Sequence, residues 1–198
     1  MRADMHGGKR MSENTDNGGG RRGNRWRKAV WSTAALLLVL PLVAMQFTDE
    51  VVWDLADFVV FGAMLAGACA AYEFAASVTR NNAYRGATAV AIAAAFILVW
   101  MNLAVGIIGN EGNPANLMYG GVLAVGIIGA IIARFQSHGM VRALVATALA
   151  QTLVAVIALI AGLGHTLMLT GFFVALWLTS AQLFRKAARE QVSAGATP

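Results

Sequence analysis

The sequence predicts an all-α, polytopic membrane helical bundle of six transmembrane helices, with the N-terminus and the C-terminus in the cytoplasm. The first observation is composition, since 58% of the 198 residues are hydrophobic and 13% are charged. A soluble domain carries charge on about a quarter of its residues and could not hide so much apolar surface from water. The second is that the apolar residues fall into six runs, each close to the ~20 residues that a helix needs to cross a bilayer. The third is the placement of the charges.

The positions of the basic residues indicate which of the predicted connectors lie in the cytoplasm. Eight of the 15 Lys and Arg precede the first apolar run, and the remaining ones lie between or after the runs. With the N-terminus inside, all of them lie on or beside the cytoplasmic face, as the positive-inside rule requires, and the acidic connectors fall outside. The net charge of +5 is therefore a topology signal, and we expect the lipid bilayer, and no nucleic acid, as the partner of this charge.

The chain begins with a segment that we expect to be a disordered, basic cytoplasmic tail, residues 1–28, because it lacks apolar periodicity. The first helix is predicted over 29–47. A basic segment before an apolar run also describes a signal peptide. The run is longer than the about 7–15 residues of a signal-peptide core, and its residues 42–44 match the cleavage pattern poorly. We favour an uncleaved anchor, and cleavage stays the alternative.

The second helix is predicted over 58–76 and follows an acidic connector. Asp54 and Asp57 would share one face of a helical turn, where two carboxylates can bind a cation. The interpretation that we prefer is negative charge at the start of a helix, which the helix dipole favours. Gly62 and Gly67 lie among alanines at spacings that let another helix backbone approach closely.

The third and fourth helices, predicted over 87–109 and 117–135, form a hairpin around Asn110–Asn116. Asn113 and Pro114 suit the cap and first position of the returning helix. The heptapeptide LAVGIIG occurs on both sides of this turn, and we interpret both copies as helical surfaces for close packing. An antiparallel hairpin about the turn places Gly106 opposite Gly120.

The same hairpin register places Trp100 opposite Gly126. The predicted helix-packing residues are Gly62, Gly67, Trp100, Gly106, Gly109, Gly120, Gly126 and Gly129. The fifth and sixth helices are predicted over 140–163 and 167–184, and a cytoplasmic C-terminal tail over 187–198.

Two segments, WMNLAVGIIGNEGNPANLMYGGVLAVGIIGAIIARF and GMVRALVATALAQTLVAVIAL, resemble a group of small multi-pass proteobacterial inner-membrane proteins. The resemblance extends from the first helix to the RKAAREQ segment and leaves the N-terminal arm outside. It implies a location in the bacterial inner membrane. It transfers no functional residue.

Polar side chains inside apolar runs are the candidates for function, because an unsatisfied polar group is costly in hydrocarbon. Glu73, Asn102 and Gln151 are the three candidate intramembrane polar residues. Glu73 can carry a proton or hold a cation. The interpretation that we prefer is that it lies at the interface, where it pairs with Arg80 or Arg85 or faces water. Asn102 and Gln151 fall in the middle of their predicted spans, so they can line a solute path or join helices by hydrogen bonding, the more common use.

The sequence contains no catalytic motif. We find no phosphate-binding glycine loop, no HExxH, no CxxC and no GxSxG. His165 lacks a second histidine nearby, and Glu111 among asparagines offers a single carboxylate, so we expect no metal site and no cofactor.

The favoured function is that of a non-enzymatic accessory, assembly or scaffolding membrane subunit, associating with other membrane proteins or with copies of itself. Abundant Gly and Ala at helix spacing motivate this interpretation. The alternative is a small-solute or ion carrier or channel with Glu73, Asn102 and Gln151 along its path.

Overall fold

The computed structural model describes residues 27–49, 51–110, 112–163 and 167–195. Within these residues the regular structure is helical, without strands, and six helices are long and apolar enough to cross a membrane. This confirms the all-α prediction and the number of candidate spans. Of the predicted disordered tail, 1–28, the residues before 27 lie outside the described residues, and residues 27 and 28 belong to the first helix. The six candidate spans are Arg27–Ala44, Leu55–Val78, Asn82–Ala104, Pro114–Ile132, Ser137–Ile160 and Leu167–Gly195.

Two helices end far from their predicted limits. The third, α3 (Asn82–Ala104), ends five residues before the predicted 109. The sixth, α6 (Leu167–Gly195), continues well beyond the predicted 184, so most of the expected C-terminal tail is helix. This extension packs against the protein, because Ala187 and Ala188 are buried. The apolar run alone did not predict it, since the extension is polar on its other faces.

The chain divides into two compact units, Met1–Cys69 and Ala70–Pro198, and α2 (Leu55–Val78) contributes to both. In the first unit, the helix Arg27–Ala44 approaches the start of α2. A Cβ at Gly62 would lie 3.7 Å from Cδ1 of Leu38, which is ordinary contact. Gly62 therefore lies at a contact between two helices, as its sequence context predicts.

The start of α2 is capped by its own carboxylates. The Asp54 N–H donates to Oδ2 of Asp57, and the Asp57 N–H donates to Oδ1 of Asp54, both at 3.0 Å. This reciprocal arrangement satisfies backbone donors at a helix N-terminus in the manner of a capping box. Trp53 packs edge-on against Phe58 and Phe61 at the same place. The two carboxylates thus serve the helix start, the interpretation that we preferred to a cation site.

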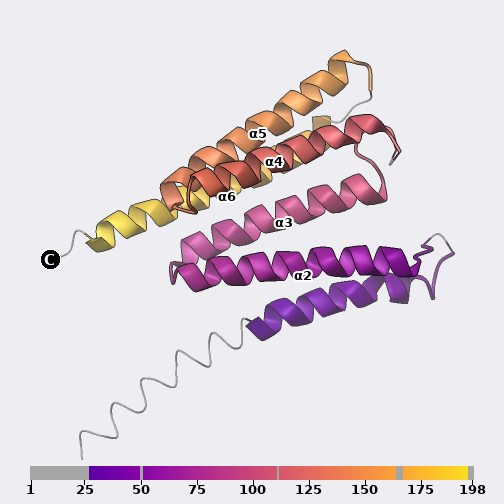
Figure 1. Cartoon of the computed structure of the whole chain (residues 1–198), viewed down its shortest axis with the longest axis horizontal. Helices are drawn as coiled ribbons and strands as arrows, with labels where there is room; N and C mark the ends of the chain where they lie inside the picture. The colour runs from indigo at the N-terminus through magenta and orange to yellow at the C-terminus, as the bar shows by residue number, and fades with distance from the viewer. Residues whose placement is uncertain (1–26, 50, 111, 164–166, 196–198) are drawn as a thin grey trace, which may run out of the picture. The chain divides into compact units, whose positions relative to one another are not determined.

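Besides the end of α2, the second unit contains four helices, with α5 (Ser137–Ile160) packed against α6 and against α4 (Leu117–Ile132). α3 packs mainly on α6, and it meets α4 far less than a simple hairpin would. Figure 1 shows these helices running side by side, with α4 and α5 adjacent. α5 is apolar around most of its circumference because neighbours cover several of its faces.

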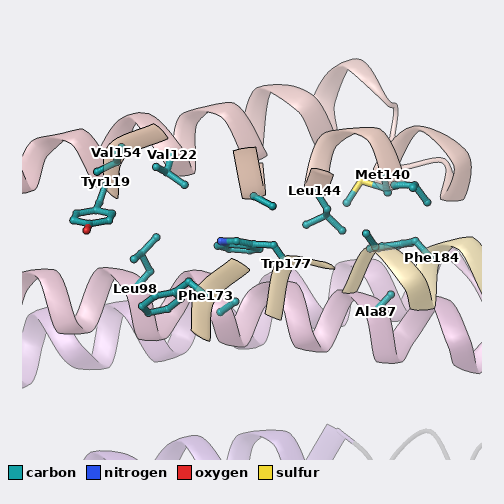
Figure 2. Close-up of a cluster of buried hydrophobic side chains, with 14 of the residues drawn as sticks. Ala87, Leu98, Tyr119, Val122, Met140, Leu144, Val154, Phe173, Trp177 and Phe184 are labelled. Carbon is teal, nitrogen blue, oxygen red and sulfur yellow. The ribbon is translucent and has the colours of Figure 1, made fainter. Parts of the chain in front are cut away.

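Large side chains fill the interior of this unit. Leu98 from α3, Tyr119 from α4, and Phe173 and Phe184 from α6 are all at most 1% exposed. Figure 2 shows them directed into the space between the helices, and the Trp177 ring lies in the same space. The outward faces carry exposed branched apolar residues instead, for example Ile127, Ile128, Ile131 and Ile132 on α4.

Candidate functional site

The α3–α4 connection begins at a glycine that stops α3. Gly106 has φ +72°, a left-handed conformation that glycine adopts without a Cβ penalty. The N–H groups of Val105 and Gly106 both donate to the Met101 carbonyl, at 3.1 Å, and so satisfy the end of the helix. The helix therefore ends inside the first LAVGIIG copy.

Asn116 fixes the segment that follows. Its Oδ1 accepts from the N–H groups of Ile107 at 3.1 Å and Ile108 at 2.8 Å. Its Nδ2 donates to the carbonyl oxygens of Ile108 at 3.3 Å and Asn110 at 2.6 Å. Asn116 is 4% exposed and Ile108 is fully buried. One amide thus replaces the backbone partners that 107–110 would have had in a longer helix.

Two other asparagines belong to the same connection. Asn113 caps the short helix η1 (Pro114–Asn116) by accepting from the Ala115 N–H at 2.9 Å, as its sequence context predicts. Asn102 donates its Nδ2 to the Asn116 carbonyl at 3.2 Å. Because α3 ends at Ala104, Asn102 lies in the last turn of its helix and not in the middle of the span, where we expected it.

The two LAVGIIG copies have different structures, which corrects our interpretation of both as helical packing surfaces. In the first copy, Gly106 and Gly109 lie in the connection after α3, both at φ +72°. They serve backbone turns and not helix packing. The second copy is helical throughout, within α4. The same heptapeptide therefore adopts two conformations, and the residues that each copy contacts decide which one it adopts.

The glycines of the second copy bring α4 close to α5. A Cβ at Gly129 would lie 2.8 Å from Cβ of Ala143, and a Cβ at Gly126 would lie 3.1 Å from Oγ1 of Thr147. A side chain at Gly129 would force α5 to shift, whereas one at Gly126 would need the Thr147 side chain to move by a few tenths of an ångström. The expected pairing of Trp100 with Gly126 is wrong, because the atoms nearest to that position belong to Thr147.

Two further predicted packing glycines face open space. A Cβ at Gly67 or at Gly120 would meet nothing within 4 Å. Gly120 therefore does not make the close approach that we expected opposite Gly106. The hairpin register that predicted it assumed a continuous third helix, which the structure replaces with the connection at 105–110.

Glu73 lies half-buried near the C-terminal end of α2. Arg85, one of the two partners that we considered for it, donates its Nε to the Thr79 carbonyl at 3.0 Å and a terminal nitrogen to the Ala76 carbonyl at 2.6 Å. Its guanidinium thereby satisfies carbonyl groups at and after the end of α2, which have no partner within the helix.

Gln151 lies at the middle of α5 and is 1% exposed. The Ser137 hydroxyl donates to Oε1 of Gln191 at 3.0 Å, which fixes the antiparallel register of α5 and α6. Moving inward from each by the same number of residues leads to Gln151 and Trp177. The hydrogen bond from Ser180 to Ala87 sets the antiparallel register of α6 and α3, and this register places Val90 of α3 at the level of Trp177. Asn102 lies 12 residues further along α3, which is about 18 Å at 1.5 Å per residue. Asn102 and Gln151 do not meet.

The end of the unit that carries basic residues is joined by hydrogen bonds that the sequence analysis did not predict. Asn81 Nδ2 donates to Glu190 Oε2 at 2.9 Å, and the Tyr84 hydroxyl donates to the Phe135 carbonyl at 2.7 Å. Deeper, the Ser180 hydroxyl donates to the buried Ala87 carbonyl at 2.7 Å. The sequence signal at this end was Asn81 before an apolar run, which is typical of a helix cap. In the structure, Oδ1 of Asn81 accepts from the Tyr84 N–H.

Among the described residues, no group of three His, Cys, Asp or Glu side chains is placed to hold a metal ion. His165 and Glu111 lie outside the described residues. The hydrogen bonds of Asn116, Arg85, Tyr84 and Ser180 satisfy backbone groups at helix ends and between helices. Comparison of the chain with protein-family models, with curated proteins and with solved structures finds no match.

Proposed function

We propose that this chain is a multi-pass protein of the bacterial inner membrane that works without catalysis, as an accessory, assembly or scaffolding subunit. Its six apolar helices cross the bilayer with both termini in the cytoplasm. The exposed branched residues on α4 support lipid as their surroundings, because a water-soluble protein rarely exposes such a surface. The charge distribution supports the orientation.

One observation carries the choice between association and transport. Two of the polar side chains inside the helices, Asn102 and Ser180, hydrogen-bond to a neighbouring segment, and Asn102 lies far from Gln151 along the bundle. Asn102 is bonded to the hairpin, Ser180 to the carbonyl of Ala87, and Gln151 lies at another level. A solute path through Glu73, Asn102 and Gln151 would need them to share one cavity, and the separation of Asn102 from Gln151 by about 18 Å along the bundle favours association.

A surface suited to association lies on α2. Ala63, Ala66 and Gly67 are exposed, and a Cβ at Gly67 would meet nothing within 4 Å. Small residues at such spacing let a second helix approach closely in lipid, where packing replaces the hydrophobic drive. The proposed role is therefore to receive a helix of another membrane protein or of a second copy at this face.

The test is purification of the full chain in mild detergent, with measurement of its mass and of the proteins that accompany it in stoichiometric amount. We expect an oligomer or a complex that Gly67→Leu disrupts. Gly171→Leu is the matched control, because Gly171 on α6 is also exposed and open. A lone monomer, together with solute flux in liposomes that Glu73→Gln abolishes, would establish the carrier instead. A reporter fused after Pro198 that is active only in the periplasm would overturn the orientation.

A further inference from the structure

Several buried polar groups in the second unit, among them Oδ1 of Asn102, have no hydrogen-bond partner in the protein, and two of them form the basis of this inference. Oε1 of Gln151, an acceptor, and Nε1 of Trp177, a donor, have no hydrogen-bond partner. Gln151 is 1% exposed and Trp177 is 3% exposed. Leaving such groups unpaired in an apolar interior costs about 1–3 kcal/mol each, so a pair of them calls for an explanation.

The two groups lie at the same level of the bundle. The hydrogen bond from Ser137 to Gln191 sets the register of α5 against α6, and this register brings Gln151 level with Trp177. On the other side, the close approaches at Gly129 and Gly126 set the register of α4 against α5 and bring Val122 to the same level. Figure 2 shows the ring nitrogen of Trp177 at the end of the indole that faces Val122 and Leu98.

The surroundings leave few other partners. Val122 is apolar and 1% exposed. Thr147, one turn from Gln151 on the same face of α5, donates its hydroxyl proton to the Ala143 carbonyl at 2.9 Å and keeps only acceptor capacity. The level therefore presents acceptors from α5 and a donor from α6.

A third unpaired group lies on the same face of α6. Oγ1 of Thr170 has no partner, and Thr170 is 7% exposed. It lies two turns from Trp177 and in the first turn of its helix, toward the end of the bundle opposite the basic residues. Thr170 and Trp177 are therefore two unpaired polar groups on one face of α6, with the apolar Phe173 between them.

We infer that Gln151 and Trp177 form an internal binding site for a small neutral molecule that carries a hydroxyl group. The hydroxyl proton is donated to Oε1 of Gln151, and the hydroxyl oxygen accepts from Nε1 of Trp177. Water and a small alcohol share this chemistry. A charged ligand does not fit, because no ionised side chain faces the site from these helices at this level to balance it. The site is independent of the proposed association, which uses another surface.

The test uses the full chain in detergent micelles with ¹⁵N-labelled tryptophan. The indole N–H signal of Trp177 is identified by its loss in Trp177→Phe, or by elimination with single Phe substitutions of the other four tryptophans. We expect a magnetisation transfer from water to this N–H in the wild-type protein. Gln151→Leu should shift the signal and remove the transfer, whereas Thr152→Val, on the exposed side of α5, should do neither.

Glycerol separates the two sources of the hydroxyl. A saturable shift of the Trp177 signal on addition of glycerol identifies a small alcohol as a ligand, and no shift identifies water. Because the wild-type transfer is measured without any change at Gln151, a failure of Gln151→Leu to fold does not prevent the test. The inference is overturned if the Trp177 N–H receives no transfer from water or glycerol. A signal that Gln151→Leu shifts although no transfer exists would mean that the two side chains bond directly.

Discussion

Replacing Asn116 with alanine tests whether one buried amide holds the α3–α4 connection. The side chain makes four hydrogen bonds to backbone groups of Ile107, Ile108 and Asn110. The N–H and the carbonyl of fully buried Ile108 would lose their partner. At about 1–3 kcal/mol for each unsatisfied buried group, the change costs about 2–6 kcal/mol. Asn113→Ala removes one capping bond and should cost only about 1 kcal/mol.

The assay is the thermal midpoint of the full chain in mild detergent, followed as loss of monodisperse protein on a sizing column. At about 2–4 °C per kcal/mol for a chain of this size, Asn116→Ala should lower the midpoint by at least about 4 °C. Hydrogen exchange at Ile107 and Ile108 should also become faster in this variant. Asn110→Ala is the matched control, because Asn116 bonds only the main-chain carbonyl of Asn110, which alanine retains. Equal midpoints for Asn116→Ala and Asn110→Ala would refute the role given to this amide.

Two further predictions concern helix contacts, and the same midpoint measures both. Gly129→Ala should destabilise the protein by about 1–3 kcal/mol, because the new Cβ would lie 2.8 Å from that of Ala143. Gly120→Ala should be neutral or slightly stabilising, since nothing lies within 4 Å of its position. A loss of stability at Gly120 as large as at Gly129 would contradict this. Ser180→Ala removes a buried hydrogen bond of 2.7 Å to α3 and should cost about 1 kcal/mol. Ser193→Ala, at an exposed position of α6, should change the stability little. Equal effects of the two serine changes would argue against a structural role for Ser180.

Helix placement was largely predictable because it follows from transfer of apolar side chains out of water. Each apolar run needs neighbours or lipid along its length, and length alone selects helices that cross a bilayer. The start of α2 was equally readable, since Asp54 and Asp57 have the spacing that lets each side chain reach the other's N–H. These features depend on residues within one turn of each other.

The candidate site was less predictable. The sequence singled out Gln151 as a polar group inside an apolar run, but it did not single out Trp177, which lies at the same level of the bundle. Most buried tryptophans belong to a core, and only the register of α5 against α6 places Trp177 at the level of Gln151. Likewise, Asn102 was assigned to mid-span because the end of α3 was misplaced.

What the sequence alone determined is the all-helical class and the number of helices long and apolar enough to cross a membrane, because hydropathy is a sum over local residues. What the tertiary structure decided is the use of each glycine. The same heptapeptide LAVGIIG is a helix end and turn at 103–109 and continuous helix at 123–129. The difference is a partner: the amide of Asn116 takes the N–H groups of Ile107 and Ile108, whereas the second copy keeps its backbone bonds and packs on α5. Backbone donors go to whichever acceptor the fold brings within reach, and a short sequence does not contain that information.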